Sequence, residues 1–126
     1  MTPTPFLSVV PQRHGMDCAV ACLAMLCGVS YEVALLALGV PQVMTSGAAV
    51  RQVRAAAKRL KHPLRMRRVF DLDTDTGILG VRSDRWTSEH LVVLKEGLIV
   101  DTDATIWDAD VFLAAYQATA VSLLTL

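Results

Sequence analysis

Apolar residues follow a helical period in the first half of the chain and a strand-like period in the second half. Residues 16–27 are almost uninterruptedly apolar, which predicts a buried helix that ends at Gly28. Ser30 is a typical N-cap for a second helix over residues 31–38. A third helix is expected at about residues 46–60, because its apolar positions form one stripe and its basic residues lie opposite.

From residue 64 onward, short apolar runs alternate with polar residues and turn signals. This pattern predicts strands at residues 64–69, 77–81, 91–94, 98–100 and 120–124, with a short helix that begins after Asp108 and runs through Tyr116. A Lys95-Glu96-Gly97 turn is expected to join two of these strands into a hairpin. A short apolar segment at residues 6–10, flanked by prolines, predicts an edge strand or an extended arm. Helices followed by antiparallel strands indicate an α+β fold.

The composition is that of one globular domain over residues 1–126, with 53% hydrophobic residues. Twelve basic residues balance twelve acidic ones, so no overall charge favours nucleic acid as a partner. The apolar runs break well before the roughly 20 residues that a membrane span needs, and no secretory signal is visible. All three cysteines fall between positions 18 and 27, which is a poor layout for disulfides. We therefore expect a cytoplasmic protein.

Cys18 is the first candidate for chemistry, because it stands where the first helix begins. A thiol there faces unpaired backbone N–H groups and the positive end of the helix dipole, and both favour the reactive thiolate. Cys22 and Cys27 lie inside the apolar helix and are expected to be core residues. These local features alone favour neither a structural nor a nucleophilic role for Cys18.

His90 and Asp101 flank the expected hairpin and suggest a base and its orienting carboxylate. His90 directly precedes the strand at 91–94, and Asp101 directly follows the strand at 98–100. A four-residue connection would set the two opposite each other, so that the carboxylate could fix the imidazole tautomer. A different turn register would place Asp103 beside His90 instead. Upstream, the Gln12 amide and the Cys18 backbone N–H could together stabilise an oxyanion.

Three other interpretations of these residues remain open. His14 could replace His90 as the base, although its closeness in sequence to Cys18 does not establish geometry. Asp17 is better explained as an N-cap of the first helix than as a catalytic group. Cys18, Cys22, His14 and His90 could bind zinc, but the chain has no paired Cys-x₂-Cys ligands. We therefore expect no metal and no cofactor.

In this order, the motifs resemble those of the bacteriocin-processing peptidases. The matching features are Gln12, Asp17-Cys18 with its Ala-rich helix, the His90-Leu-Val-Val-Leu run and the Leu-Ile-Val-Asp101 run. Those proteins are papain-like cysteine peptidases that remove double-glycine leader peptides, often as the N-terminal domain of an ABC exporter. The resemblance covers nearly the whole chain. It leads us to expect proline after Asp101, where this chain has Thr102.

The resemblance implies a papain-like fold, with N-terminal helices packed on a C-terminal antiparallel sheet. It also implies Cys18 as nucleophile, His90 as base, Asp101 as orienter and Gln12 as oxyanion donor. The expected activity is cleavage of a peptide bond, such as one that joins a leader peptide, or of an isopeptide bond. The expected partner is therefore a peptide or protein substrate. Two alternatives stand beside it: a peptide-binding module that keeps the fold without catalysis, and a transglutaminase or deconjugating enzyme that uses the same triad.

Overall fold

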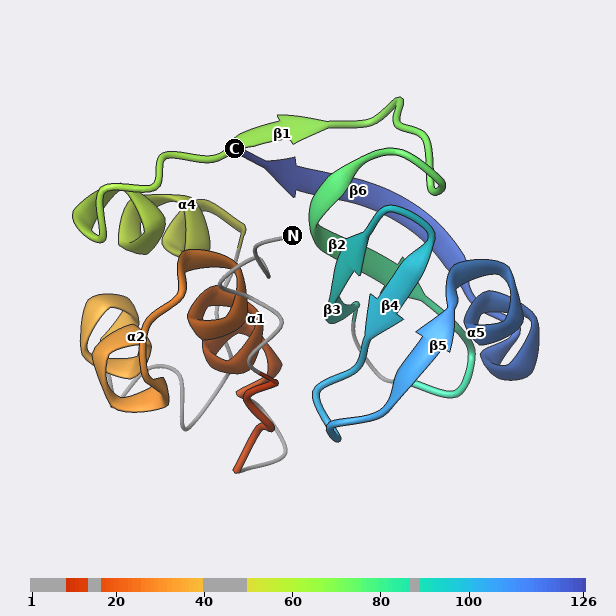
Figure 1. Cartoon of the computed structure of the whole chain (residues 1–126), viewed down its shortest axis with the longest axis horizontal. Coiled ribbons are helices and arrows are strands. Elements are labelled where there is room, and N and C mark those ends of the chain that lie inside the picture. The colour runs from red at the N-terminus through yellow and green to blue at the C-terminus, as the bar shows by residue number, and fades with distance from the viewer. Residues whose placement is uncertain (1–8, 14–16, 40–49, 87–88) are drawn as a thin grey trace, which may run out of the picture.

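The computed structural model describes residues 9–13, 17–39, 50–86 and 89–126. Within these ranges, three helices come first and a six-stranded antiparallel sheet with one further helix follows, so the expected α+β class is confirmed (Figure 1). In chain order the described elements are α1 (Cys18–Cys27), α2 (Tyr31–Leu38), α4 (Val50–Arg59), β1 (Arg65–Arg67), β2 (Thr76–Arg82), β3 (His90–Lys95), β4 (Leu98–Val100), β5 (Ile106–Asp108), α5 (Ala109–Tyr116) and β6 (Thr119–Thr125).

Helix α1 is the buried centre of the N-terminal half. All of its residues except Cys18 are buried, as the unbroken apolar run predicts. The helix ends at Gly28, which adopts a left-handed φ of 68° and donates its backbone N–H to the carbonyl of Ala24. The end of the helix is therefore where the sequence places it, whereas residue 16 lies outside the described part of the chain.

Helices α2 and α4 complete the helical layer around α1. The Ser30 hydroxyl accepts the Val33 backbone N–H at 3.1 Å, which confirms the expected N-cap. Helix α4 buries Val53 and Ala57, whereas Arg54 on the opposite side is exposed, so its apolar stripe is also confirmed. Residues 46–49 of the expected third helix, and most of the expected arm at 6–10, lie outside the described residues.

The strand order of the sheet is β1-β6-β2-β3-β4-β5, which places β2 and β3 near its middle. Lys95 pairs with Leu98, so Glu96 and Gly97 alone form the connection between β3 and β4. Both residues have a positive φ, 45° and 91°, as a tight type I′ hairpin turn requires. The expected four-residue connection is therefore wrong. Strand β5 was not expected, because three residues carry too short an alternation to be recognised.

Two apolar clusters fill the two faces of the sheet. Leu91 and Val93 of β3 pack with α1, α2 and α4, and Val92 and Leu94 pack on the opposite face with Phe112 of α5. Figure 1 shows the same arrangement, with α1, α2 and α4 at one side of the sheet and α5 at the other. The alternation of β3 thus contributes apolar side chains to both layers, and the strand begins at His90.

No single helix in the described ranges has both the length and the apolar composition to cross a membrane. Helices α1 and α2 meet that test only as a pair, and they are bent by 116° relative to each other.

Candidate active site

Cys18, His90 and Asp101 lie close together. The His90 Nε2 atom lies 2.9 Å from Oδ1 of Asp101, and Cys18 is close enough to the imidazole to raise the pKa of His90. Because Asp101 engages Nε2, Nδ1 is the ring nitrogen left for the thiol. The structure therefore brings together the first residue of α1, the first residue of β3 and the residue after β4.

The surroundings of His90 favour its protonated form. Burial by itself lowers the pKa of the imidazole, but hydrogen bonds to Asp101 and Cys18, together with their negative charges, outweigh it. The net result raises the pKa of His90 from 6.5 to about 9. An imidazolium at neutral pH is the partner that a cysteine thiolate needs.

Asp101 reaches His90 although the strand register does not place the two opposite each other. Val93 pairs with Val100, and the same register continued for three residues would set His90 against Asp103. Strand β4 ends before that point, and the chain turns there, with the Asp101 N–H bonded to the Thr105 carbonyl at 2.8 Å. The buried Asp101 side chain thus remains beside His90, whereas exposed Asp103 accepts the backbone N–H and hydroxyl of Thr105.

Thr102, the residue that follows Asp101, holds Gln12 next to the group formed by Cys18, His90 and Asp101. Its backbone N–H donates to the Thr102 carbonyl at 2.8 Å, and its side-chain Oε1 accepts the Thr102 hydroxyl. Hydrogen bonds thereby link Gln12, Thr102, Asp101 and His90 in that order, and His90 lies near Cys18. The four residues expected to form the site are gathered in one place. The link through Thr102 was not foreseen.

Asp17 occupies the N-cap position of α1, but its side chain makes no capping hydrogen bond. Its Oδ2 atom instead accepts the Tyr31 hydroxyl at 2.5 Å and the Arg13 backbone N–H at 2.9 Å. The Arg13 guanidinium lies 4.1 Å from the centre of the Tyr31 ring and forms an ion pair with Glu32 at 2.9 Å. The expected N-cap position is therefore confirmed, but the buried carboxylate accepts hydrogen bonds from Tyr31 and Arg13 instead of from the first turn of α1. Asp17 ties the segment before Cys18 to α2.

Tyr31→Phe should lower the free energy of unfolding by about 1–3 kcal/mol, because it removes a donor from a carboxylate that is 0% exposed. Urea unfolding followed by circular dichroism measures the change. In an Asp17→Asn background the same substitution should cost clearly less, since the charged acceptor is gone. A loss below about 0.5 kcal/mol in the native background would contradict the role given to this hydrogen bond.

The other two cysteines are core residues, as expected. Burial raises the pKa of Cys22 far above its ordinary value, and the nearby charges of Cys18 and Asp101 raise it further. Burial also raises the pKa of Cys27 to about 11. All three cysteines are free thiols, and only Cys18 is accessible enough to react.

Trp86, an aromatic residue that was not predicted to belong to the site, packs against the His90 imidazole. The Trp86 ring lies 5.0 Å from the His90 ring, centre to centre, and 5.5 Å from Tyr116 of α5. Burial, followed by the charges of Asp101 and Asp103, raises the pKa of Tyr116. The only signal in the sequence is a tryptophan four residues before the histidine, and its contact depends on the path of the loop.

The two alternative sites proposed from the sequence include His14, which lies outside the described residues. Its proposed role as base and the zinc set that includes it therefore stay predictions. Within residues 9–13, 17–39, 50–86 and 89–126, no three or more His, Cys, Asp or Glu side chains are grouped so that they could hold a metal ion.

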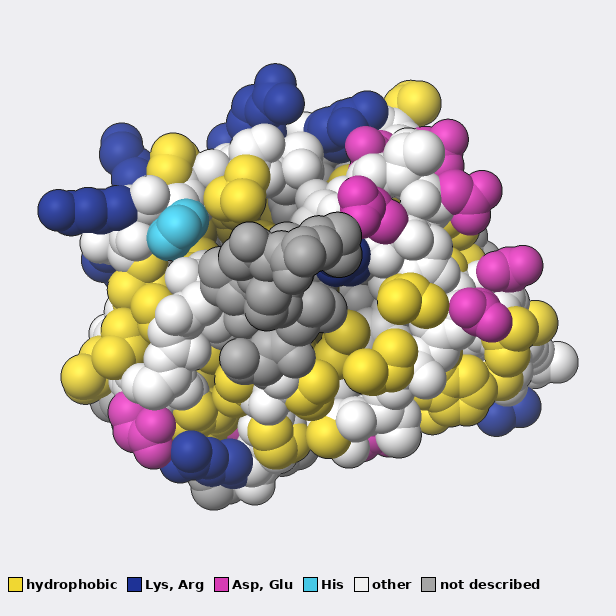
Figure 2. All heavy atoms as spheres, in the orientation of Figure 1, with side chains coloured by type: hydrophobic (Ala, Val, Ile, Leu, Met, Phe, Trp, Pro, Cys, Tyr) yellow, Lys and Arg dark blue, Asp and Glu magenta, His cyan; other side chains and the backbone are white. Residues whose placement is uncertain are grey.

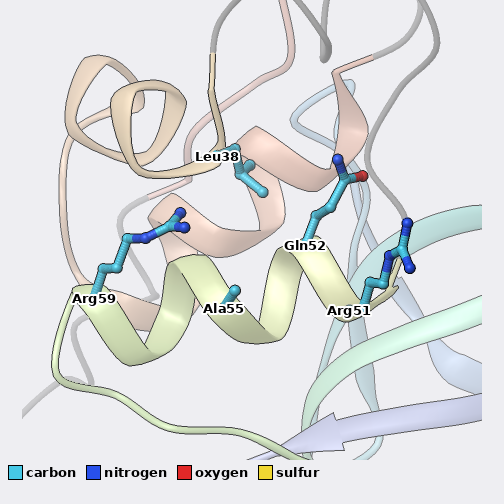
Figure 3. A pocket seen from close by; sticks show the side chains of 5 residues that line it. All are labelled: Leu38, Arg51, Gln52, Ala55 and Arg59. Atoms are coloured by element: carbon cyan, nitrogen blue, oxygen red, sulfur yellow. The ribbon is translucent and has the colours of Figure 1, made fainter.

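A hollow of about 340 Å³ lies elsewhere, between α2 and α4. Figure 3 shows the side chains around it, which are Leu38, Arg51, Gln52, Ala55 and Arg59. None of the candidate catalytic residues lines it. On the face in Figure 2, basic side chains gather over α4 and β1, and acidic ones gather over the turns on the right, so no single sign of charge covers this face.

Comparison of the chain with models of known protein families and with curated protein sequences finds no match. A function for the site therefore rests on the arrangement of Cys18, His90, Asp101 and Gln12 in this structure.

Proposed function

We propose that this protein is a cysteine peptidase-like hydrolase of papain-like fold, with Cys18 as nucleophile, His90 as acid and base, and Asp101 as orienter. The observation that carries the proposal is the position of His90, which is hydrogen-bonded to Asp101 and lies close enough to Cys18 for the thiol to raise the pKa of the imidazole. A carboxylate on one ring nitrogen holds the tautomer and favours the imidazolium, so that the other nitrogen can exchange a proton at the thiol.

The reaction follows from this charge arrangement. The Cys18 thiolate attacks the carbonyl carbon of a peptide or isopeptide bond, and the Gln12 amide and the Cys18 backbone N–H stabilise the oxyanion that forms. The His90 imidazolium donates its proton to the departing amine and becomes neutral. It then takes a proton from water, which attacks the thioester and releases the acid and the thiolate. The protonation states of Cys18 and His90 are restored at the end.

The substrate class in this proposal is a peptide or protein, and the resemblance to leader peptidases favours a leader peptide. A reducing compartment such as the cytoplasm suits the three free thiols, one of which must stay unoxidised for the chemistry. The hydrolytic outcome distinguishes this proposal from a transferase with the same triad, since a transferase would pass the acyl group to an amine.

Selective reactivity of Cys18 is the first test. Iodoacetamide in limiting amount should alkylate Cys18 at least about tenfold faster than Cys22 or Cys27, because the latter two are buried neutral thiols. p-Nitrophenyl acetate should acetylate Cys18, and the acetyl group should then be lost to water. Mass spectrometry of digested protein locates both modifications, and a Cys22→Ala variant serves as control because its Cys18 should react as before.

Equal labelling of Cys18 and Cys22 would contradict the proposal. If Cys18 can be alkylated but never acetylated, and Cys18→Ala retains the biological activity, the protein is a binding module that keeps this fold. Such a module would hold an extended peptide by strand addition and apolar pockets.

A further inference from the structure

Thr102 uses all three of its backbone and hydroxyl polar groups at the site. Its backbone N–H donates to Oδ1 of Asp101 at 2.7 Å, which is the same oxygen that faces Nε2 of His90. Its hydroxyl donates to Oε1 of Gln12, and its carbonyl accepts the Gln12 backbone N–H at 2.8 Å. The residue is only 2% exposed, so water does not compete for these bonds.

We propose that Thr102 is a positioning residue that sets the orientation of both the Asp101 carboxylate and the Gln12 amide, and so couples the base to the oxyanion donor. This inference rests on the proposed function, because it assigns Thr102 a part in the same acyl transfer. Thr102 contacts neither the thiol nor the reacting carbonyl in this scheme. It acts through Gln12 on one side and Asp101 on the other.

The orientation of the Gln12 amide depends on the Thr102 hydroxyl. An amide group is planar, so holding its oxygen on Thr102 fixes the place of its Nε2 donor on the opposite side. Without the hydroxyl, the side chain gains rotational freedom and the amide can turn its oxygen toward the oxyanion, which would repel it. A donor must be fixed in place before the charge develops in order to contribute fully to the rate.

The orientation of the Asp101 carboxylate depends on the Thr102 backbone N–H. That bond keeps Oδ1 aimed at Nε2 of His90, and it exists only because the residue after the aspartate is not proline. The resemblance led us to expect proline at this position. A proline there would remove the donor to Asp101 and the hydroxyl to Gln12 at once, so this chain holds its site by a different connection.

The test uses small probes to isolate the contact between the Thr102 hydroxyl and Gln12, because Thr102→Val keeps the backbone N–H that bonds to Asp101. Acetylation of Cys18 by p-nitrophenyl acetate passes through an oxyanion, whereas alkylation by iodoacetamide does not. Thr102→Val should therefore slow acetylation about tenfold and leave the rate and pH profile of alkylation unchanged, because one misplaced donor accounts for part of the 10²–10³-fold value of a full oxyanion donor. Thr102→Ser, which keeps the hydroxyl, should stay within about twofold of the native rate.

Two further variants exclude a merely structural effect. In a Gln12→Ala background, Thr102→Val should have no further effect on acetylation, since the group it positions is absent. Thr105→Val removes a hydroxyl from the same turn that binds Asp103 and Trp107 instead, and it should leave acetylation within about twofold of native.

Equal acetylation rates for Thr102→Val and the native protein would overturn the inference, as would a full Thr102→Val effect in the Gln12→Ala background. If the proposed function is wrong, the result is different, because native Cys18 would then not be acetylated at all. That result would overturn both proposals.

Discussion

His90→Gln should slow acetylation of Cys18 by about 10²–10⁴-fold, the range that a positioned acid and base contributes. Glutamine has a similar length and is polar, so it can fill the half-buried space beside Asp101. It cannot carry the positive charge that the imidazole holds through its hydrogen bonds to Asp101 and Cys18. The loss therefore reports proton transfer and charge pairing rather than loss of the fold, which circular dichroism checks independently.

The loss in His90→Gln should be specific to the imidazole rather than to any change near it. Glu89→Gln is a matched control, because Glu89 is adjacent to His90 in sequence but its carboxylate pairs with Arg82, at 3.7 Å. Its acetylation rate should stay within about twofold of that of the native protein. A native acetylation rate in His90→Gln would contradict the role of His90 as acid and base.

Secondary structure could be predicted from the sequence wherever local signals agreed with the final packing. Gly28 and Ser30 end and begin helices through backbone and side-chain bonds within a few residues, so both boundaries were predicted correctly. Strand β5 could not be predicted, because its three residues are stabilised by pairing with β4 rather than marked by their own alternation. Asp17 is the N-cap residue of α1 as predicted, but the donor to its side chain, Tyr31, could not be predicted because it lies fourteen residues away on another helix.

The four candidate site residues could be named from the sequence, but the reason for their proximity could not. Asp101 contacts His90 because the chain turns after β4, not because a four-residue hairpin sets the two in register. The roles of Thr102 and Trp86 depend on how distant loops meet, and a single residue type in a loop carries no information about that. Chemistry-bearing residues are thus easier to recognise than the bonds that orient them.

Asp101→Asn should slow acetylation of Cys18 by about 10²-fold or more and should also change how stability depends on pH. Asparagine can still accept the Thr102 N–H through its side-chain oxygen, but it brings no negative charge to His90. The pKa of His90, about 9 in the native protein, should fall back toward its ordinary value of 6.5. An NMR titration of the His90 ring measures this shift directly, with His90→Gln used to assign its signal.

The sign of the stability change follows from the raised pKa of His90. Because folding favours the protonated ring, its contribution to the free energy of unfolding is complete below about pH 6.5 and is lost as the pH rises through about 9. The stability difference between the native protein and Asp101→Asn should therefore be largest near pH 6 and should shrink toward alkaline pH, as urea unfolding at several pH values can measure. Asp103→Asn, which alters an exposed carboxylate bonded to Thr105, should show no such trend. A difference that grows with pH would contradict the Asp101–His90 ion pair, since only a group with a lowered pKa behaves in that way.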